Sequence, residues 1–123
     1  MVLAIIGSRS FNDMELLEEK LSEYVGKATR VVSGGAKGAD SLAERWAFRH
    51  GCDLSIHLPD WKKHGKKAGF IRNIEIINEC DECVAFWDGK SRGTHHSIFM
   101  CNKLNKKVTI VEYEKIDRGN KIQ

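Results

Sequence analysis

Apolar and polar residues alternate along the chain in blocks that predict strands separated by helices. Five short apolar runs have the length of strands: residues 2–6, 30–32, 53–58, 82–87 and 108–111. Four intervening segments repeat apolar residues at helical spacing: about 14–25, 39–48, 68–78 and 94–104. Because strand and helix alternate, we predict an α/β fold, a single-domain Rossmann-like doubly wound parallel sheet with right-handed crossovers.

The same pattern predicts which helical residues face the core. They are Met14, Leu17, Leu21 and Val25 in the first helix, Ala39, Leu42, Ala43, Trp46 and Ala47 in the second, and Ile71, Ile74 and Ile77 in the third. Pro59 ends the third strand, and residues 59–67 are predicted to form a polar loop. Residues 114–123 are predicted to be a polar C-terminal tail, so that the domain covers residues 1–113.

Composition indicates an ordinary globular domain. The chain has 123 residues, 41% of them hydrophobic, and a mean hydropathy of -0.40, which suits one domain with one core. We expect a cytoplasmic protein, because there is no apolar run of ~18 residues and no basic segment before the short apolar N-terminus. The net charge of +3 favours an anionic partner only weakly. The four cysteines, with no second zinc-like pair, are expected to be reduced thiols in the core or at helix ends: Cys52, Cys80, Cys83 and Cys101.

A glycine-rich stretch follows the second strand and leads into the second helix. It runs Ser33-Gly34-Gly35-Ala36-Lys37-Gly38-Ala39-Asp40. Glycine tolerates positive φ, and without a Cβ it lets a phosphate approach the backbone N–H groups at a helix start. The alternative is a tight strand-to-helix turn that binds nothing.

Two further polar stretches, Gly7-Ser8-Arg9 and 87–94, also follow strands. In an open parallel sheet, ligands bind outside the carboxyl ends of the strands near the topological switch point. Three anion-friendly strand ends therefore predict a phosphate-bearing ligand. The candidate ligand-binding residues are Gly7, Ser8, Arg9, Phe11, Ser33, Gly34, Gly35, Gly38, Ala39, Asp40, Trp61, Arg72, Asn73, Trp87, Asp88, Ser91, Gly93 and Thr94.

Individual roles have structural alternatives. Arg9 is suited to pairing with a phosphate, or it forms a surface ion pair. Asp40 and Asp88 are candidates to accept hydrogen bonds from ribose hydroxyls, whereas Asp40 also suits the first turn of a helix as a dipole partner. Trp87 and Trp61 are candidates to stack on a base, with a core position as the alternative for Trp87.

The serine and threonine hydroxyls in these stretches are equally suited to capping helices. Arg72-Asn73 lie among isoleucines, which indicates that their helix borders the pocket. His95 and His96 diverge by ~100° on a helix and cannot form one metal site by themselves. We expect no metal site and no cofactor.

Five ordered motifs resemble the SLOG superfamily, and most closely its small branch related to YspA and YpsA. They are Gly7-Ser8-Arg9 with Phe11, the 33–40 stretch, Pro59-Asp60-Trp61, Gly69 with Arg72-Asn73, and Ala85-Phe86-Trp87-Asp88-Gly89 with Ser91 and Gly93-Thr94. The resemblance covers about residues 3–111 and implies a Rossmann-like domain that binds nucleotides or nucleotide-derived ligands. Relatives include Lonely Guy phosphoribohydrolases, DNA-binding DprA and sensors of cyclic ADP-ribose-type signals. It also implies a homodimer or higher homo-oligomer.

The hydrolase motif of that superfamily is incomplete here. Gly93-Thr94 match its Gly-Thr, but Ser97 stands where the catalytic glutamate belongs. Arg72 resembles the family's catalytic arginine, and Glu75, one turn away, is the candidate to replace the missing carboxylate. Loss of that carboxylate favours a binding protein over an enzyme.

Three functions follow, in order of preference. The first is binding of a small nucleotide-derived ligand, of ADP-ribose type or related, by a sensor or sequestering protein. The second is hydrolysis of a nucleotide. The third is single-stranded nucleic-acid binding through a lysine-rich stretch beside an aromatic side chain, formed by Trp61, Lys62, Lys63, Lys66 and Lys67.

Overall fold

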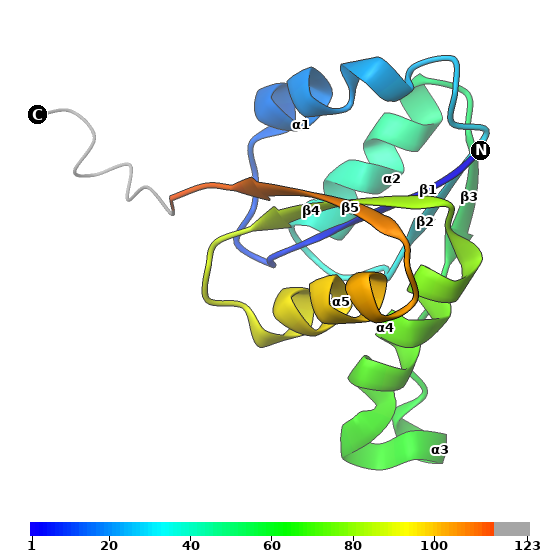
Figure 1. Ribbon diagram of the computed structural model, residues 1–123, viewed down its shortest axis with the longest axis vertical. Helices are drawn as coiled ribbons and strands as arrows, with labels where there is room; N and C mark the ends of the chain where they lie inside the picture. Colours follow the sequence, from blue (N-terminus) through cyan, green and yellow to red (C-terminus); the bar gives the residue numbers. More distant parts are fainter. Residues whose placement is uncertain (115–123) are drawn as a thin grey trace, which may run out of the picture.

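The protein forms a five-stranded parallel sheet of order β3-β2-β1-β4-β5, as seen in a computed structural model that describes residues 1–114 (Figure 1). The strands are β1 (Val2–Gly7), β2 (Arg30–Ser33), β3 (Asp53–Ile56), β4 (Glu82–Trp87) and β5 (Lys107–Glu112). The helices are α1 (Met14–Lys20), α2 (Ala39–Arg49), α3 (Trp61–His64), α4 (Ala68–Glu79) and α5 (Arg92–Lys103), with 3-10 turns η1 (Ser22–Tyr24) and η2 (Gly65–Lys67). This confirms the Rossmann-like α/β prediction.

The sheet lies between two helical layers. Figure 1 shows α1 and α2 on one face and α4 and α5 on the other, with α3 projecting beyond the second layer. Strand β1 supplies both cores because successive side chains point to opposite faces. Leu3 and Ile5 pack in the core that contains Trp46, while Ala4 and Ile6 pack in the core that contains Ile77.

The strand order places the topological switch point at β1. The chain first builds outward on one side, from β1 to β2 to β3, and then crosses to place β4 on the other side of β1. Within this register Gly7, at the end of β1, lies opposite Phe86 of β4. The loops that follow β1 and β4 therefore leave the sheet side by side, as the switch-point rule requires of a binding crevice.

The first helix is shorter than its hydrophobic pattern predicts. Helix α1 ends at Lys20, and the Ser22 hydroxyl donates to the Glu19 carbonyl at 2.8 Å as the chain tightens into η1. Tyr24 takes the buried position, and its hydroxyl donates to Glu82 at 3.0 Å. Val25 lies beyond the turn and is 49% exposed, so its predicted core position is wrong.

Two other predictions about the middle of the chain are also wrong in part. Residues 61–67 form α3 and η2 rather than an irregular loop, because the Asp60 carboxylate accepts from Lys63 N and caps the turn. In α4, Ile77 is buried as predicted, but Ile76 replaces Ile71 and Ile74, which are only partly buried. The buried side of the helix carries Asn73, Ile76 and Ile77, and Asn73 and Ile76 line the pocket.

The cysteines occupy core and near-core positions. Cys80, Cys83 and Cys101 are buried and Cys52 is partly buried, all as free thiols. The predicted tail, residues 114–123, lies almost wholly outside the described part of the chain. No helix within residues 1–114 is long and apolar enough to cross a membrane.

Gly7 tests how tightly β1, β4 and α2 are packed at the switch point. A Cβ built on Gly7 would lie 2.4 Å from the Phe86 carbonyl oxygen and 2.7 Å from Ala39 Cβ. We expect Gly7→Ala to lower the free energy of unfolding by about 1–3 kcal/mol, measured by urea denaturation. The matched control is Gly93→Ala in α5, where a Cβ meets nothing within 4 Å. Equal stability of Gly7→Ala and the wild type would contradict this packing.

Candidate functional site

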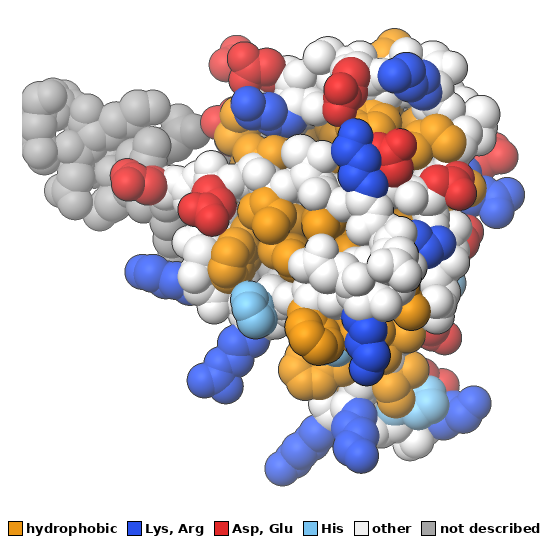
Figure 2. Space-filling view, viewed as in Figure 1, with side chains coloured by type: hydrophobic (Ala, Val, Ile, Leu, Met, Phe, Trp, Pro, Cys, Tyr) orange, Lys and Arg blue, Asp and Glu red, His pale blue; other side chains and the backbone are white. Residues whose placement is uncertain are grey.

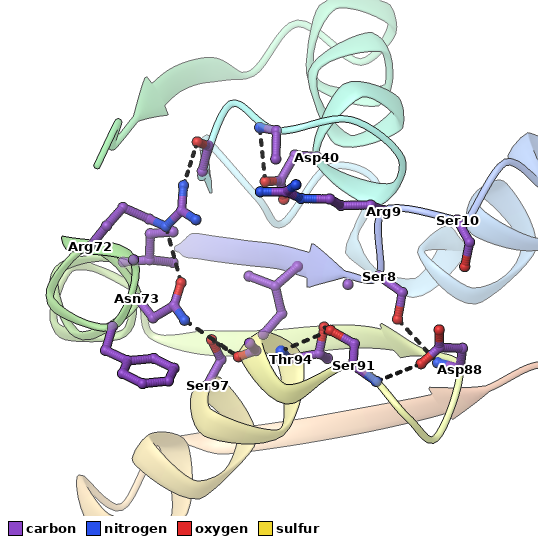
Figure 3. Close-up of a pocket in the computed structure, with 18 of the residues that line it drawn as sticks. Ser8, Arg9, Ser10, Asp40, Arg72, Asn73, Asp88, Ser91, Thr94 and Ser97 are labelled. Atoms are coloured by element: carbon purple, nitrogen blue, oxygen red, sulfur yellow. Dashed lines mark hydrogen bonds between the residues drawn. The ribbon is translucent and has the colours of Figure 1, made fainter. Parts of the chain in front are cut away.

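A pocket of about 510 Å³ opens at the carboxyl ends of β1, β2 and β4 (Figure 3). Its volume lies within the range typical of small-molecule sites. The lining residues are Ile6, Gly7, Ser8, Arg9, Ser10, Gly34, Ala36, Asp40, Trp61, Gly69, Phe70, Arg72, Asn73, Ile76, Asp88, Ser91, Gly93, Thr94 and Ser97. Helix α4 forms one wall, and the first turn of α5 and the loop before α2 face each other across the end of β1.

The loop before α2 packs directly on the turn after β1. Gly38 has φ of 75°, and a Cβ on it would lie 2.4 Å from the Arg9 carbonyl oxygen and 2.5 Å from that of Ser8. The next residue, Ala39, donates its N–H to the Ser8 carbonyl at 3.3 Å. Only glycine permits this approach, which brings Arg9 and Asp40 to the same side of the pocket.

A hydrogen-bonded chain links α4 to both flanking loops. Arg72 Nη1 donates to the Gly34 carbonyl at 2.7 Å, and Arg72 Nε donates to Asn73 Oδ1 at 3.0 Å. Asn73 Nδ2 in turn donates to the Gly93 carbonyl in the first turn of α5, at 3.3 Å. Asn73 is only 9% exposed, so this amide spans the pocket wall as a buried bridge.

The pocket combines two guanidinium groups with one buried carboxyl group. Burial lowers the pKa of Arg72. The charge of nearby Asp40 raises this pKa, and the charge of Arg9 lowers it further. Burial also raises the pKa of Asp40, although a hydrogen bond from Ala36 N at 3.1 Å and the charge of Arg72 act in the opposite direction. Arg9 is exposed on the pocket lining. This arrangement favours an anion beside Arg9 and offers Asp40 as a hydrogen-bond acceptor.

The loop after β4 is organised by Asp88. Its Oδ1 accepts the N–H groups of Lys90 and Ser91, both at 2.8 Å, and these bonds lower the pKa of Asp88. Its own N–H donates to the Ser8 hydroxyl at 3.2 Å, which joins this loop to the turn after β1. Trp87 Nε1 donates to the Ser91 carbonyl at 3.1 Å and closes the loop from the other side.

Helix α5 begins directly from that loop. Ser91 is its N-cap and accepts from Thr94 N at 3.3 Å. Thr94 and Ser97 both line the pocket, and the Ser97 hydroxyl donates to the Gly93 carbonyl at 3.2 Å. The start of this twelve-residue helix therefore lies at the pocket opposite Arg9 and Asp40 (Figure 3), where its dipole favours an anion.

The structure brings most of the predicted site residues together. Those that line the pocket are Gly7, Ser8, Arg9, Gly34, Asp40, Trp61, Arg72, Asn73, Asp88, Ser91, Gly93 and Thr94. Those that do not line it are Phe11, Ser33, Gly35, Gly38, Ala39 and Trp87.

The residues outside the pocket have structural positions instead. Phe11 is buried and stacks on Phe86 with ring centroids 4.7 Å apart. Ser33 and Ala39 are fully buried under the glycine loop, and Gly38 meets the backbone of the preceding turn. Glu75, the candidate replacement carboxylate, is exposed and does not line the pocket.

Seven lining residues were not among the predicted site residues: Ile6, Ser10, Ala36, Gly69, Phe70, Ile76 and Ser97. Ile6 and Ile76 form an apolar floor and have the same sequence pattern as core residues. Gly69 and Ser97 lie within the motifs of the family resemblance, so their sequence neighbourhood was a usable signal. Phe70 carries no such signal, because an aromatic residue in a helix usually packs in a core.

Among residues 1–114, no group of three or more His, Cys, Asp or Glu side chains is arranged to hold a metal ion. The polar side chains that line the pocket are instead serine and threonine hydroxyls, the amide of Asn73, two arginines and two aspartates.

The fold and the pocket define a Rossmann-like domain with a polar crevice at its switch point. The chain belongs to the YspA, cpYpsA-related SLOG family, whose sequence profile matches residues 1–64. It is 41% identical over 101 residues to the Gene 61 protein of Mycobacterium phage D29, which covers 75% of this chain and 81% of that protein.

Among solved structures, the fold is similar to DNA processing protein A from Helicobacter pylori, whose reported structure concerns its single-stranded DNA binding mode. The TM-score is 0.72 with 20% sequence identity, and the match covers 93% of this chain. This chain spans 66% of the length of that structure, so the similarity defines the shared fold.

The Asp88 loop leads to a prediction about pH. A carboxyl group whose pKa is lower in the folded state stabilises the fold above its unfolded pKa of about 3.9, and this stabilisation is lost as the pH falls through the folded pKa. We expect Asp88→Asn to lower the free energy of unfolding at pH 7 by up to about 1 kcal/mol.

The deficit should shrink as the pH falls below about 4, which urea denaturation across that range measures. The matched control is Asp53→Asn, since Asp53 is exposed and its carboxylate accepts no hydrogen bond from residues 1–114. A deficit that is the same at pH 3 and pH 7 would contradict the assignment.

Proposed function

We propose that this pocket binds a small phosphate-bearing, nucleotide-derived ligand, of ADP-ribose type or related, and that the protein acts as a sensor or sequestering protein. The observation that carries the proposal is the convergence of Arg9, Arg72 and the start of α5 on one pocket of about 510 Å³. Three separate segments of the chain supply these positive groups, and all three face the same pocket.

The chemistry of the lining residues supports this ligand class. A phosphate placed between Arg9 and the first turn of α5 can accept charge-assisted hydrogen bonds from the Arg9 guanidinium. The hydroxyl groups of Ser91 and Thr94 line the same part of the pocket. Asp40 accepts hydrogen bonds and suits the hydroxyl groups of a ribose. The buried Asn73 bridge keeps the two sides of the pocket at a set separation.

The charge on Arg9 tests the proposal. We expect wild-type protein to bind AMP or ADP-ribose in isothermal titration calorimetry, and Arg9→Gln to weaken that binding about 10- to 100-fold, because a charged hydrogen-bond donor is lost. The matched control is Arg45→Gln on the exposed face of α2, which removes the same charge outside the pocket. Failure of the wild type to bind any of a panel of mononucleotides and ADP-ribose derivatives would overturn the proposal.

Mass spectrometry of the same mixtures distinguishes binding from hydrolysis. Release of free base or ribose 5-phosphate would establish turnover, whereas intact ligand supports a sensor or sequestering protein. Binding is favoured because Ser97, at the position of the family's catalytic glutamate, donates to the Gly93 carbonyl, and Glu75 does not line the pocket.

Single-stranded nucleic acid is the second candidate ligand, and a specific surface favours it. Four lysines are exposed on α3 and η2, directly after the pocket-lining Trp61: Lys62, Lys63, Lys66 and Lys67. Figure 2 shows basic side chains gathered around this projecting end of the molecule. The similar fold of DNA processing protein A, described for its single-stranded DNA binding mode, supports the same candidate.

This second function predicts a strong salt dependence. If the four lysines each contact a phosphate of an oligothymidylate, the logarithm of the affinity should fall against the logarithm of salt concentration with a slope of about −3. Replacing all four with glutamine should abolish most of that slope in a fluorescence anisotropy titration. The control is the double variant Lys20→Gln, Lys103→Gln, which removes exposed lysines elsewhere. Affinity that is insensitive to salt would exclude this function.

The homo-oligomer implied by the family resemblance stays a prediction.

A further inference from the structure

The two tryptophans that the sequence offers for base stacking have different surroundings. Trp61 lines the pocket, and its side chain is 57% exposed. Trp87 does not line the pocket, since its ring packs beside His95 and its Nε1 is engaged with the Ser91 carbonyl. Of these two tryptophans, Trp61 is therefore the one available to a ligand in the pocket.

The indole of Trp61 is held in place by backbone rather than by a closed core. The Asp60 carboxylate caps the helical turn that begins at Trp61. The Cη2 atom of the indole lies 3.7 Å from the point where a Cβ of Gly69 would stand, so the ring lies beside the bare backbone of the first turn of α4. The ring thus has a neighbour on α4 and still exposes 57% of the residue's surface.

The pocket is chemically divided along its length. Its polar end is formed by Ser8, Arg9 and Asp88, at the carboxyl ends of β1 and β4, and Figure 3 shows Ser8 and Asp88 at the end opposite Arg72. Its aromatic lining is formed by Trp61 of α3 and Phe70 of α4, and the Phe70 ring lies tilted against His96 with ring centroids 4.4 Å apart. An aromatic ring on the ligand finds aromatic side chains only in the second of these two parts, among the lining residues that the structure describes.

We infer that Trp61 is a stacking subsite for an aromatic base and that it sets the orientation of the ligand, with the base toward α3 and the phosphate toward Arg9 and the start of α5. This inference rests on the proposed function and adds to it a requirement for an aromatic base. The base is supplied either by a free nucleotide or by a nucleotide unit of a single strand, since both present the same planar ring.

The experiment compares ligands with and without a base. We expect Trp61→Ala to weaken the binding of AMP about 5- to 100-fold, the range measured for removal of one base-stacking aromatic residue. The binding of ribose 5-phosphate, which lacks the base, should be unchanged. Trp61→Phe should restore most of the AMP affinity and Trp61→Leu should not. The matched control is Phe48→Ala, which removes a 90% exposed aromatic side chain from α2, away from the pocket.

A spectroscopic readout separates stacking from a general structural effect. AMP should quench tryptophan emission in the wild type, ribose 5-phosphate should not, and the quenching by AMP should disappear in Trp61→Phe. A second pair, an oligothymidylate and an abasic oligonucleotide of the same length, shows whether a nucleic-acid strand uses the subsite.

The outcomes distinguish this inference from the proposed function. Equal weakening of AMP and ribose 5-phosphate in Trp61→Ala, or unchanged AMP binding, would overturn the stacking subsite while leaving the proposed function in place. If the wild type bound none of the four probes, the proposed function would fail, and the subsite with it.

Discussion

The backbone of Gly38 packs against the carbonyl groups of Ser8 and Arg9, and the rest of the site depends on this contact. A Cβ at position 38 would lie 2.4 Å from the Arg9 carbonyl oxygen, so no other residue allows α2 to start where it does. Through this contact the turn after β1 and the loop after β2 share one wall of the pocket. Arg9 and Asp40, thirty-one positions apart in sequence, thereby face the same space.

The opposite wall depends on a buried polar bridge. Arg72 carries a charge that burial disfavours, and its hydrogen bond to the Gly34 carbonyl and the nearby Asp40 offset that cost. Asn73 accepts from Arg72 and donates to the Gly93 carbonyl, so the two side chains together join the glycine loop to the first turn of α5. These hydrogen bonds restrain both segments, and a ligand that contacts both therefore meets a preorganised site.

Alternating hydrophobic blocks were sufficient to predict the parallel α/β class of the fold and most of its helices. Burial of the sheet on both faces leaves continuous apolar runs for the strands, and the helices between them show helical spacing of apolar residues. The same signal was misleading where a side chain had a competing demand. Val25 has the spacing of a core residue, but the chain leaves the helix before reaching it, and Tyr24 is buried instead. Residues 61–67 looked like a loop because their helical turns bury nothing and depend on the Asp60 cap.

The candidate site was predictable to the extent that its residues follow strands. Gly7 ends β1, and Ser8, Arg9 and Asp88 come directly after β1 and β4; strand-end reasoning places all four correctly at the pocket. Ile6 and Ile76 could not be found this way, since an apolar pocket floor and an apolar core have the same composition. Trp87 shows the converse limit: as the last residue of β4 it was a candidate ligand contact, but its N–H is used to close the Asp88 loop.

The carboxyl groups of the pocket limit the chemistry that the site can perform. Asp88 is tied to two backbone N–H groups in its own loop, which stabilises the charged form and leaves it poorly suited to exchange protons near neutral pH. Asp40 has a raised pKa, but its Oδ2 is engaged with Ala36 N, and it balances the buried charge of Arg72. Both carboxylates thus stabilise the loops that form the pocket, and protonation of Asp40 would weaken the charge balance that holds Arg72. Their hydrogen bonds thus give both carboxyl groups a structural role at the pocket wall.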